Sequence, residues 1–403
     1  MKKSVLLITI TLAFNMMFGT HALAESPSQA PLTHSESAFL MEANTGQVLF
    51  DKNANVPMYP ASVTKIATAI FAIETGNLED IVTISNEASA KNVVGTTVFL
   101  DEGEKVTLRK LIQGLLINSG NDAGVAIAEH LSGSMEQFSE EINTYLEDVI
   151  GTEKTNFENP HGLFDEDHVT TAEDLAKITQ HAMRNDTFME IFGAKELKWN
   201  GKTWDTIIHS HHKIVKGEIP YDEVTGGKNG FVSKSGFTLV TTAEKNDLSL
   251  IAVTLKSSFD SEAYEDTINL LDYGFENFTI SSIDEGTIFT VEGQEYTAPE
   301  KLSFAHSLDD ELDQKVEEDG IVTISNENDT ITSFQLEKLD NGNPAEGMDK
   351  PSLNSHETSI LDDIFPVLPS ITIGFVLGVL FMIMIRMIKS YKRKFVKNDK
   401  YFY

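Results

Sequence analysis

Hydrophobic positions in the middle of this chain recur at helical spacing. Residues 62–75 are apolar at that spacing and end at Gly76-Asn77, which is typical of a helix terminus. Thr170 followed by Glu173 predicts the capping box of another helix. The same spacing predicts three more helices between these two, over residues 108–117, 123–131 and 135–150.

Strand-like patterns lie on either side of these helices. Residues 38–43 and 47–50 flank Asn44-Thr45-Gly46, which is a hairpin signal. Residues 237–243 and 248–256 are β-rich runs, and a closing helix is predicted beyond them at 264–275. Because the strands come from both ends of this region, we expect an α/β (α+β) fold in which one sheet is covered by helices.

The pattern of hydrophobic and polar residues changes after about residue 280. Residues 281–340 consist of short alternating runs separated by Gly and Asn turns, which predicts a small β-rich domain. Residues 341–363 are rich in Pro, Gly, Ser and Asn and favour a linker. We therefore expect a main domain over residues 25–280, followed by the small β domain and a spacer.

The N-terminal segment has the pattern of a secretory signal peptide over residues 1–24. Lys2 and Lys3 precede a mostly apolar run, and Ala22-Leu23-Ala24 supplies a small-residue cleavage site. An uncleaved anchor helix is the alternative, but the small residues at the end of the run favour cleavage.

The C-terminal segment predicts a membrane anchor. Residues 364–385 carry no charge and are long enough to span a bilayer, although Pro366 and Pro369 leave an interfacial helix open. Residues 386–403 are strongly basic, and the positive-inside rule places such a tail in the cytoplasm. We expect a single-pass protein of the cell membrane whose main domain lies outside the cytoplasm.

Charge and cysteine content exclude several classes of function. The 403 residues include 31 Lys plus Arg against 62 Asp plus Glu, a formal net charge of −31. Such a surface repels phosphate backbones, so nucleic acid is not an expected partner. The chain has no cysteine, which excludes thiolate nucleophiles, disulfides and Cys-ligated metals.

Ser62 and Lys65 form a possible nucleophile and base at the start of an apolar helix. Residues at i and i+3 share a helix face, so the hydroxyl and the amine can meet. Serine needs an adjacent base, and lysine can serve only if its pKa is lowered by burial or a nearby cation. Alone this motif is weak. Ser210 and Lys213 repeat the spacing without an apolar helix, which indicates a chance copy.

Two further polar motifs are uninformative when taken singly. Ser119-Gly120-Asn121 separates two helical runs and by itself favours a capping turn. Lys228-Asn229-Gly230 by itself favours a Gly-rich turn. His209, His211 and His212 could bind a metal, but no carboxylate has ligand-like spacing, so we favour a polar loop and expect neither metal nor cofactor.

Together the three motifs have a recognisable order, S-x-x-K, S-x-N and K-x-G. The sequences Pro60-Ala61-Ser62-Val63-Thr64-Lys65, Ser119-Gly120-Asn121-Asp122-Ala123 and Asn159-Pro160-His161-Gly162-Leu163 resemble the serine D-Ala-D-Ala carboxypeptidases, the low-molecular-mass penicillin-binding proteins of peptidase family S11. The resemblance covers roughly residues 36–280. It implies a β-lactamase/transpeptidase-like sheet, and the β region, spacer and anchor also match that family's layout.

The resemblance implies a role for each matching residue. Ser62 would attack the carbonyl between two D-alanines of a peptidoglycan stem peptide, Lys65 would take its proton, and Ser119 would relay that proton. Substrate binding would fall to Asn121, Lys228, Asn229, Gly230 and Phe231, with the oxyanion between the backbone N–H groups of Ser62 and Phe231. β-Lactams would mimic the substrate and trap Ser62.

The third motif departs from the family pattern. Asn229 and Val232 stand where that family has threonines, and Lys234-Ser235-Gly236 offers a second candidate, although the neighbours of Lys228 fit better. An amide can still donate a hydrogen bond, but valine cannot. Two alternatives therefore stay open: a weakened homologue that binds wall peptides without efficient turnover and, less favoured, a β-lactamase.

Overall fold

The computed structural model describes residues 30–339 of the chain. The predicted signal peptide, the predicted linker over 341–363, the predicted anchor at 364–385 and the basic tail lie outside these residues. Within residues 30–339, no helix is both long enough and apolar enough to cross a membrane.

The helices and the strands of the described residues have the following bounds, each set given in chain order. The helical elements are η1 Ala61–Thr64, α2 Lys65–Thr75, α3 Leu108–Ile117, α4 Asn121–Ser132, α5 Met135–Tyr145, η2 Leu146–Ile150, α6 Ala172–Met183, α7 Asp186–Phe192, α8 Lys213–Lys216 and α9 Asp260–Asn277. The strands are β1 Ser37–Glu42, β2 Val48–Lys52, β3 Ile81–Thr83, β4 Lys105–Thr107, β5 Glu196–Asn200, β6 Asp205–His209, β7 Val224–Val232, β8 Gly236–Lys245, β9 Leu248–Ser257, β10 Phe278–Ile283, β11 Ile288–Val291, β12 Gln294–Thr297, β13 Leu302–Ser307, β14 Asp313–Val316, β15 Ile321–Ser325, β16 Thr330–Gln335 and β17 Glu337–Lys338.

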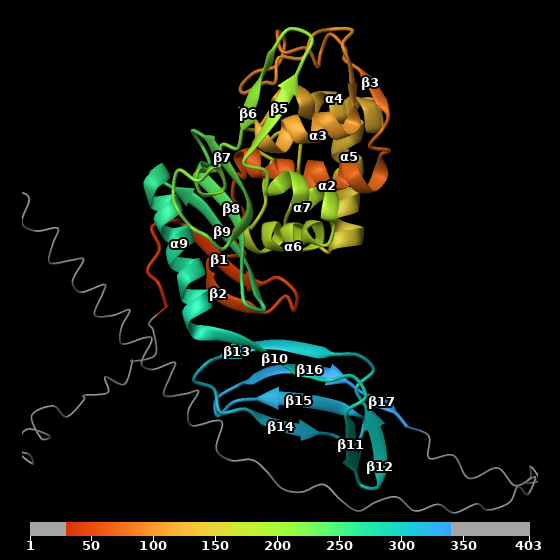
Figure 1. Cartoon of the computed structure of the whole chain (residues 1–403), viewed down its shortest axis with the longest axis vertical. Coiled ribbons are helices and arrows are strands. Elements are labelled where there is room, and N and C mark those ends of the chain that lie inside the picture. The colour runs from red at the N-terminus through yellow and green to blue at the C-terminus, as the bar shows by residue number, and fades with distance from the viewer. Residues whose placement is uncertain (1–29, 340–403) are drawn as a thin grey trace, which may run out of the picture. The chain divides into compact units, whose positions relative to one another are not determined.

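A five-stranded antiparallel sheet organises the main part of the chain. Its strand order is β2-β1-β9-β8-β7, so the N-terminal hairpin pairs with strands that follow some two hundred residues later. Figure 1 shows α9 along one face of this sheet and the group of helices α2 to α7 on the other side. The expected α+β arrangement, one sheet assembled from distant segments and covered by helices, is confirmed.

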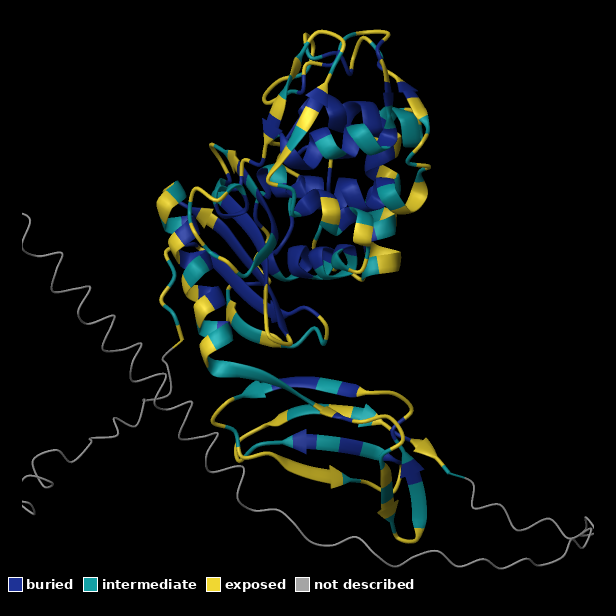
Figure 2. Cartoon of the chain, in the orientation of Figure 1, coloured by how far each residue is buried: buried dark blue, intermediate teal, exposed yellow. Residues whose placement is uncertain are grey.

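The central strands β1 and β9 are buried on both faces, which explains their nearly continuous apolar residues. In β1, Phe39 and Met41 join the core under the helices, while Ala38 and Leu40 face the second core against α9. Alternate residues of β9 divide in the same way. Successive side chains of a strand point to opposite faces, so a strand buried on both sides needs apolar residues throughout. Figure 2 shows this dark blue interior in the sheet and the helices.

Most predicted helices are confirmed, and one cap is wrong by a residue. Helix α3 has the predicted bounds, whereas the helix predicted over 135–150 ends as α5 at Tyr145 and continues as the π-turn η2. The cap of α6 is Thr171, whose side chain accepts a hydrogen bond from the backbone N–H of Asp174 at 3.0 Å. Thr170 instead pairs its backbone with Met58 in an isolated β-bridge, which keeps it outside the helix.

Short strands from β10 to β17 follow α9, as the alternating pattern predicted. They form a two-stranded and two three-stranded antiparallel arrangements, β10-β13, β11-β12-β17 and β14-β15-β16. Their interior includes Tyr296, Phe304, Val322 and Ile324. The β-rich texture is confirmed, and the domain boundary near residue 280 stays a prediction.

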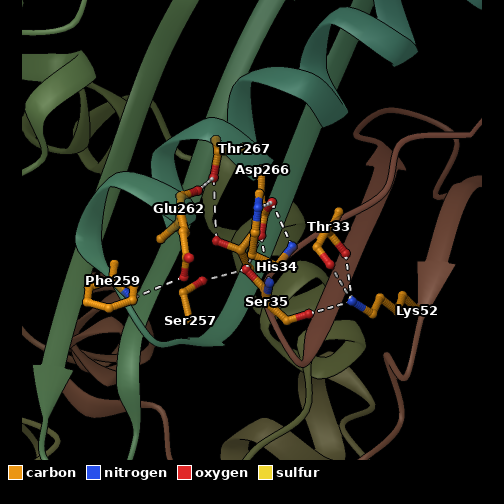
Figure 3. A network of polar contacts seen from close by, with 11 residues as sticks. Thr33, His34, Ser35, Lys52, Ser257, Phe259, Glu262, Asp266 and Thr267 are labelled. Carbon is orange, nitrogen blue, oxygen red and sulfur yellow. Dashed lines mark hydrogen bonds and ion pairs between the residues drawn. The ribbon is translucent and has the colours of Figure 1, made fainter.

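The segment before β1 is fastened to α9 and β2 by a partly buried polar network (Figure 3). Asp266 of α9 accepts hydrogen bonds from the backbone N–H groups of His34 and Ser35 at 2.9 and 2.7 Å, and from the Ser35 hydroxyl at 2.5 Å. His34 Nδ1 lies 3.0 Å from the same carboxylate. Lys52 of β2 donates to the carbonyl oxygens of Thr33 and Ser35 at 2.7 and 2.8 Å.

This network makes the stability of the fold depend on pH. The hydrogen bond to Asp266 raises the pKa of His34 above 6.5, so its contribution is present below 6.5 and is lost as pH rises through the raised value. Burial alone would raise the pKa of Asp266, but hydrogen bonds from Ser35 and His34 outweigh it and lower it below 3.8. The contribution of Asp266 is therefore present above 3.8 and is lost as pH falls through the lowered value.

We expect His34→Ala to destabilise the chain most at about pH 5 and least above about pH 8, because the ion pair exists only between the two titrations. The measurement is the free energy of unfolding in urea across this pH range. In an Asp266→Asn background, the pH dependence of the His34→Ala effect should vanish. A His34→Ala effect that is equal at both pH values contradicts the prediction.

Candidate active site

Ser62 lies in the short 3-10 turn η1, immediately before α2, and its side chain is partly exposed. The preceding residue, Ala61, has a φ of +52°, a left-handed conformation that costs free energy for any residue with a Cβ. Thr238 of β8 donates to the carbonyl oxygen of Pro60 at 2.9 Å, and Thr64 donates to that of Ala61 at 2.8 Å. The strained turn that presents Ser62 is thus fixed on both sides.

The segment 157–169 packs against the same turn. A Cβ at Gly162 would lie 1.9 Å from the carbonyl oxygen of Ala61, so only glycine fits there. His168 Nε2 lies 2.9 Å from the Thr64 hydroxyl, and its Nδ1 accepts from the backbone N–H of Glu158 at 3.0 Å. Burial lowers the pKa of His168 to about 3, so the ring is neutral and acts through these hydrogen bonds.

Lys65 is fully buried at the start of α2, and its amine touches three groups. Nζ lies 3.0 Å from Ser62 Oγ and donates to Asn121 Oδ1 at 2.8 Å and to the carbonyl oxygen of His161 at 2.6 Å. A neutral amine has two N–H groups and one lone pair. With both N–H groups donated to Asn121 and His161, the lone pair is left for the hydroxyl proton of Ser62.

The surroundings of Lys65 favour this neutral form. Burial lowers the pKa of Lys65 well below its usual value, and the charge of Lys228 lowers it further. The carboxylate of Asp122 opposes the shift and raises it in part. A lysine with a depressed pKa, in contact with a serine hydroxyl, is able to act as a general base.

The turn between α3 and α4 brings Ser119 and Asn121 to the site. Ser119 is almost fully buried, at 6 % exposure, with a φ of +59°, and within residues 30–339 its hydroxyl has no hydrogen-bond partner. Asn121 begins α4, and its side chain joins Lys65 to the carbonyl oxygen of Val94, to which Nδ2 donates at 2.8 Å. The Ser119 hydroxyl is therefore free to transfer a proton or to bind a ligand.

The third motif lies inside strand β7, so its interpretation as a Gly-rich turn is wrong. The glycines that suggested a turn are required by close packing. A Cβ at Gly230 would lie 2.6 Å from the backbone nitrogen of Ser62, and Cβ atoms at Gly226 and Gly227 would collide with Phe192 and His212. Gly230 therefore lets β7 run directly against the nucleophile turn.

Lys228 is buried on this strand, next to the site. Its Nζ donates to the carbonyl oxygen of Asn229 at 2.8 Å, and burial lowers its pKa to about 7. Asn229 is half-buried, and Phe231 is 54 % exposed with its ring 4.5 Å from that of Phe237. An anion that binds beside Lys228 would favour its charged form.

The second K-S-G candidate lies elsewhere. Lys234 is exposed in the turn between β7 and β8, and Ser235 is buried there with its hydroxyl hydrogen-bonded to the backbone of Val232 and Gly236. Lys213 of the second S-x-x-K pairs with Asp260 rather than with Ser210. Neither Lys234-Ser235-Gly236 nor the second S-x-x-K motif contributes a side chain to the contacts of the Lys65 amine.

His211 and His212 lie in the short loop between β6 and α8, as expected, whereas His209 belongs to the strand. His209 ends β6 and pairs with Glu196 across the hairpin at 3.3 Å, whereas His212 is buried, caps α8 and lies 2.9 Å from the Thr241 hydroxyl. Among residues 30–339, the structure has no cluster of three or more His, Cys, Asp or Glu side chains arranged to hold a metal ion.

Sequence reasoning missed two contributors to the site. His161 lies in a turn in which Asn159 Oδ1 accepts from the backbone N–H of Gly162 at 2.7 Å, and the carbonyl oxygen of His161 accepts from Lys65. Asp122 was overlooked although it directly follows the S-x-N motif. An acidic residue at a helix N-terminus is common, and only its burial separates it from an ordinary cap.

Comparisons with known proteins agree with this geometry. The family model described as D-alanyl-D-alanine carboxypeptidase, peptidase S11, matches residues 24–258. The D-alanyl-D-alanine carboxypeptidase DacF of Bacillus subtilis is 31% identical over 283 residues, which are 68% of this chain and 71% of the relative. The D-alanyl-D-alanine carboxypeptidase DacD of Escherichia coli is 33% identical over 303 residues, 70% of this chain and 74% of the relative.

Solved structures show the same likeness. Penicillin binding protein 5 from Haemophilus influenzae superposes with a TM-score of 0.69 at 26% identity, covering 77% of this chain and 98% of that one. Penicillin binding protein 6B from Escherichia coli superposes with a TM-score of 0.66 at 27% identity, covering 78% and 98%. The described part of the chain thus has the α+β fold of these proteins.

We expect Gly230→Ala to slow acylation of Ser62 by a fluorescent penicillin about tenfold to a hundredfold, because the added Cβ must displace the Ser62 backbone. Gly133→Ala is the matched control: Gly133 ends α4 with a φ of +83° and has open space around it. Alanine there should cost about 1–2 kcal/mol of stability without slowing acylation. Equal acylation rates in the two variants would contradict the prediction.

Proposed function

This chain belongs to the D-alanyl-D-alanine carboxypeptidase family, and from that premise we propose how its residues carry the reaction. It is a serine-type D-Ala-D-Ala carboxypeptidase and a penicillin-binding protein. The observation that carries the assignment of residues is the contact of the buried Lys65 amine, whose pKa burial lowers well below its usual value, with the Ser62 hydroxyl.

Acylation begins at Ser62. Its oxygen attacks the carbonyl carbon between the two terminal D-alanines of a peptidoglycan stem peptide, while Lys65 takes the hydroxyl proton on its lone pair. The C–N bond then breaks, and the nitrogen of the departing D-alanine receives the proton through the free hydroxyl of Ser119. Water hydrolyses the resulting ester, with Lys65 again taking the proton, and Ser62 is restored.

Two negative charges of the bound substrate need partners in the site: its terminal carboxylate and the oxyanion that forms during the attack. Lys228 attracts the terminal carboxylate, and that anion holds Lys228 in its charged form. Asn229 would donate its amide N–H to the same carboxylate. The oxyanion would accept from the backbone N–H groups of Ser62 and Phe231, which Gly230 brings together by its close approach to the Ser62 nitrogen.

β-Lactams would acylate Ser62 in the same way, because their strained amide offers the same carbonyl to the same nucleophile. We also propose that the chain works at the outer side of the cell membrane. The signal-like residues 1–24 and the apolar residues 364–385 with their basic tail support this location, which matches the site of a wall substrate.

We expect Ser62→Ala to lower D-alanine release from a synthetic peptide ending in D-Ala-D-Ala about a thousandfold or more, because no other hydroxyl of residues 30–339 contacts the Lys65 amine. In the wild type, penicillin should add its mass to the peptide that contains Ser62. Ser210→Ala, from the second S-x-x-K, is the control and should retain activity and the adduct. A penicillin adduct on a peptide without Ser62 would overturn the assignment.

We expect Asn229→Thr to raise kcat/KM for the same peptide about two- to tenfold, because a threonine hydroxyl restores the family's hydrogen bond to the carboxylate. The effect should be on KM more than on kcat. Val232→Thr is the companion variant at the second departure. An unchanged or lower kcat/KM for Asn229→Thr would mean that the amide serves as well as the hydroxyl.

A further inference from the structure

Asp122 is a buried carboxylate at the first turn of α4 whose two oxygens are filled by backbone N–H groups. The side chain accepts from Val98 at 3.0 and 3.1 Å, from Leu100 at 3.1 Å and from Ala123 at 2.9 Å. Asp122 is 0% exposed. Two of these donors belong to the segment 94–100, which precedes α3, so the carboxylate ties that segment to the start of α4.

The same turn holds the rest of this segment. Asn121 donates from its backbone N–H to the carbonyl oxygen of Thr96 at 2.7 Å and from Nδ2 to that of Val94 at 2.8 Å. Asn118 Nδ2 donates to the carbonyl oxygen of Thr97 at 2.9 Å. Each of these hydrogen bonds joins the turn that contains Ser119-Gly120-Asn121 to the backbone of residues 94–100. The turn therefore fixes the conformation of this segment.

The segment in turn orients the amide of Asn121. Because Nδ2 is committed to Val94, the other end of the amide, Oδ1, faces the Lys65 amine and accepts from it. A Cβ at Gly95 would lie 2.6 Å from Nδ2, which shows how closely the backbone approaches. A displacement of 94–100 would therefore turn or release the acceptor that fixes one N–H of Lys65.

We propose that Asp122 is a positioning residue of the reaction, which holds the segment 94–100 and thereby sets the orientation of Asn121 and the lone pair of Lys65. This inference rests on the proposed function, in which Lys65 is the base. Asp122 itself touches neither Ser62 nor Lys65 by a hydrogen bond in the described residues, so it acts through its neighbours.

The charge of Asp122 adds a second effect on the same amine. Lys228 on β7 lowers the pKa of Lys65, and Asp122 on α4 raises it. Burial raises the pKa of Asp122, while its hydrogen bonds from the backbone oppose that rise. Three histidines also lie within electrostatic reach of Lys65, but their pKa values of about 3, 3 and 4 keep them neutral: His161, His168 and His211.

Two variants test these two effects. Asp122→Asn removes the charge and keeps the size of the side chain, but its NH2 group replaces one accepting oxygen, so it also weakens the hydrogen bonds to the segment 94–100. Without the charge, the acidic limb of kcat/KM, which reports deprotonation of Lys65, should move to lower pH by about half a unit or more. Asp122→Glu keeps the charge but cannot place its oxygens between Val98 and Leu100. Asp122→Glu should lower the plateau of kcat about tenfold or more. It should shift the acidic limb of kcat/KM less than Asp122→Asn does.

The experiment measures D-alanine release and penicillin acylation by the full-length chain from about pH 5 to pH 10, with circular dichroism as a check of folding. Asp174→Asn is the control, because Asp174 is a buried carboxylate that accepts from Lys154 N at 2.9 Å and Thr155 Oγ1 at 2.9 Å, remote from the contacts of Lys65. It should lower the melting temperature and leave the acidic limb in place.

A shift of the limb in Asp122→Asn that Asp174→Asn lacks supports the inference. An unchanged pH profile in Asp122→Asn together with an unchanged plateau in Asp122→Glu overturns it. If Asp122→Asn does not fold, the test rests on Asp122→Glu alone. A plateau of kcat in Asp122→Glu equal to that of the wild type then overturns the inference. A wild type that neither releases D-alanine nor is acylated by penicillin would overturn the proposed function, and the inference with it. An active wild type whose Asp122 variants have the same pH profile and the same plateau of kcat would overturn the inference alone.

Discussion

The structure depends on keeping one lysine amine dry, uncharged and in contact with a serine hydroxyl. A buried ammonium without a paired anion is costly, so burial drives the amine of Lys65 to its neutral form, and its two N–H groups then need acceptors. Asn121 and the carbonyl oxygen of His161 supply them. Because a neutral amine that has donated both hydrogens retains one lone pair, the hydrogen bonds that satisfy Lys65 also leave this lone pair for the Ser62 hydroxyl.

This constraint explains two of the left-handed backbone conformations in residues 30–339. Ala61 and Ser119 both have left-handed φ values of +52° and +59°, although neither is glycine. Such conformations persist only where the surroundings fix them, and here hydrogen bonds and the contact of Gly162 with Ala61 do so. A relaxed turn at Ala61 would carry Ser62 away from Lys65, so part of the folding free energy is used to hold the reacting groups together.

Local signals in the sequence predicted much of the fold, and long-range packing decided what they missed. The helix over 108–117 and the first hairpin follow from neighbouring residues alone, and so does the i, i+3 contact of Ser62 with Lys65. The cap of α6 could not be assigned in this way, since Thr170 and Thr171 differ only in a distant bridge to Met58. The glycines of β7 were misleading for the same reason: they lower strand propensity, yet Ser62, Phe192 and His212 leave no room for a side chain.

Two buried lysines beside one another would be an unusual arrangement if both had to stay charged. The structure resolves this by giving them different environments. Lys65 has acceptors for a neutral amine and a distant anion in Asp122, whereas Lys228 has a pKa of about 7 and a single carbonyl contact, so it stands ready to gain a proton when an anion arrives. A substrate carboxylate would therefore charge Lys228 and pair with it. Because the anion and the new ammonium nearly cancel, binding would add little net charge beside Lys65, and burial would continue to favour its neutral form.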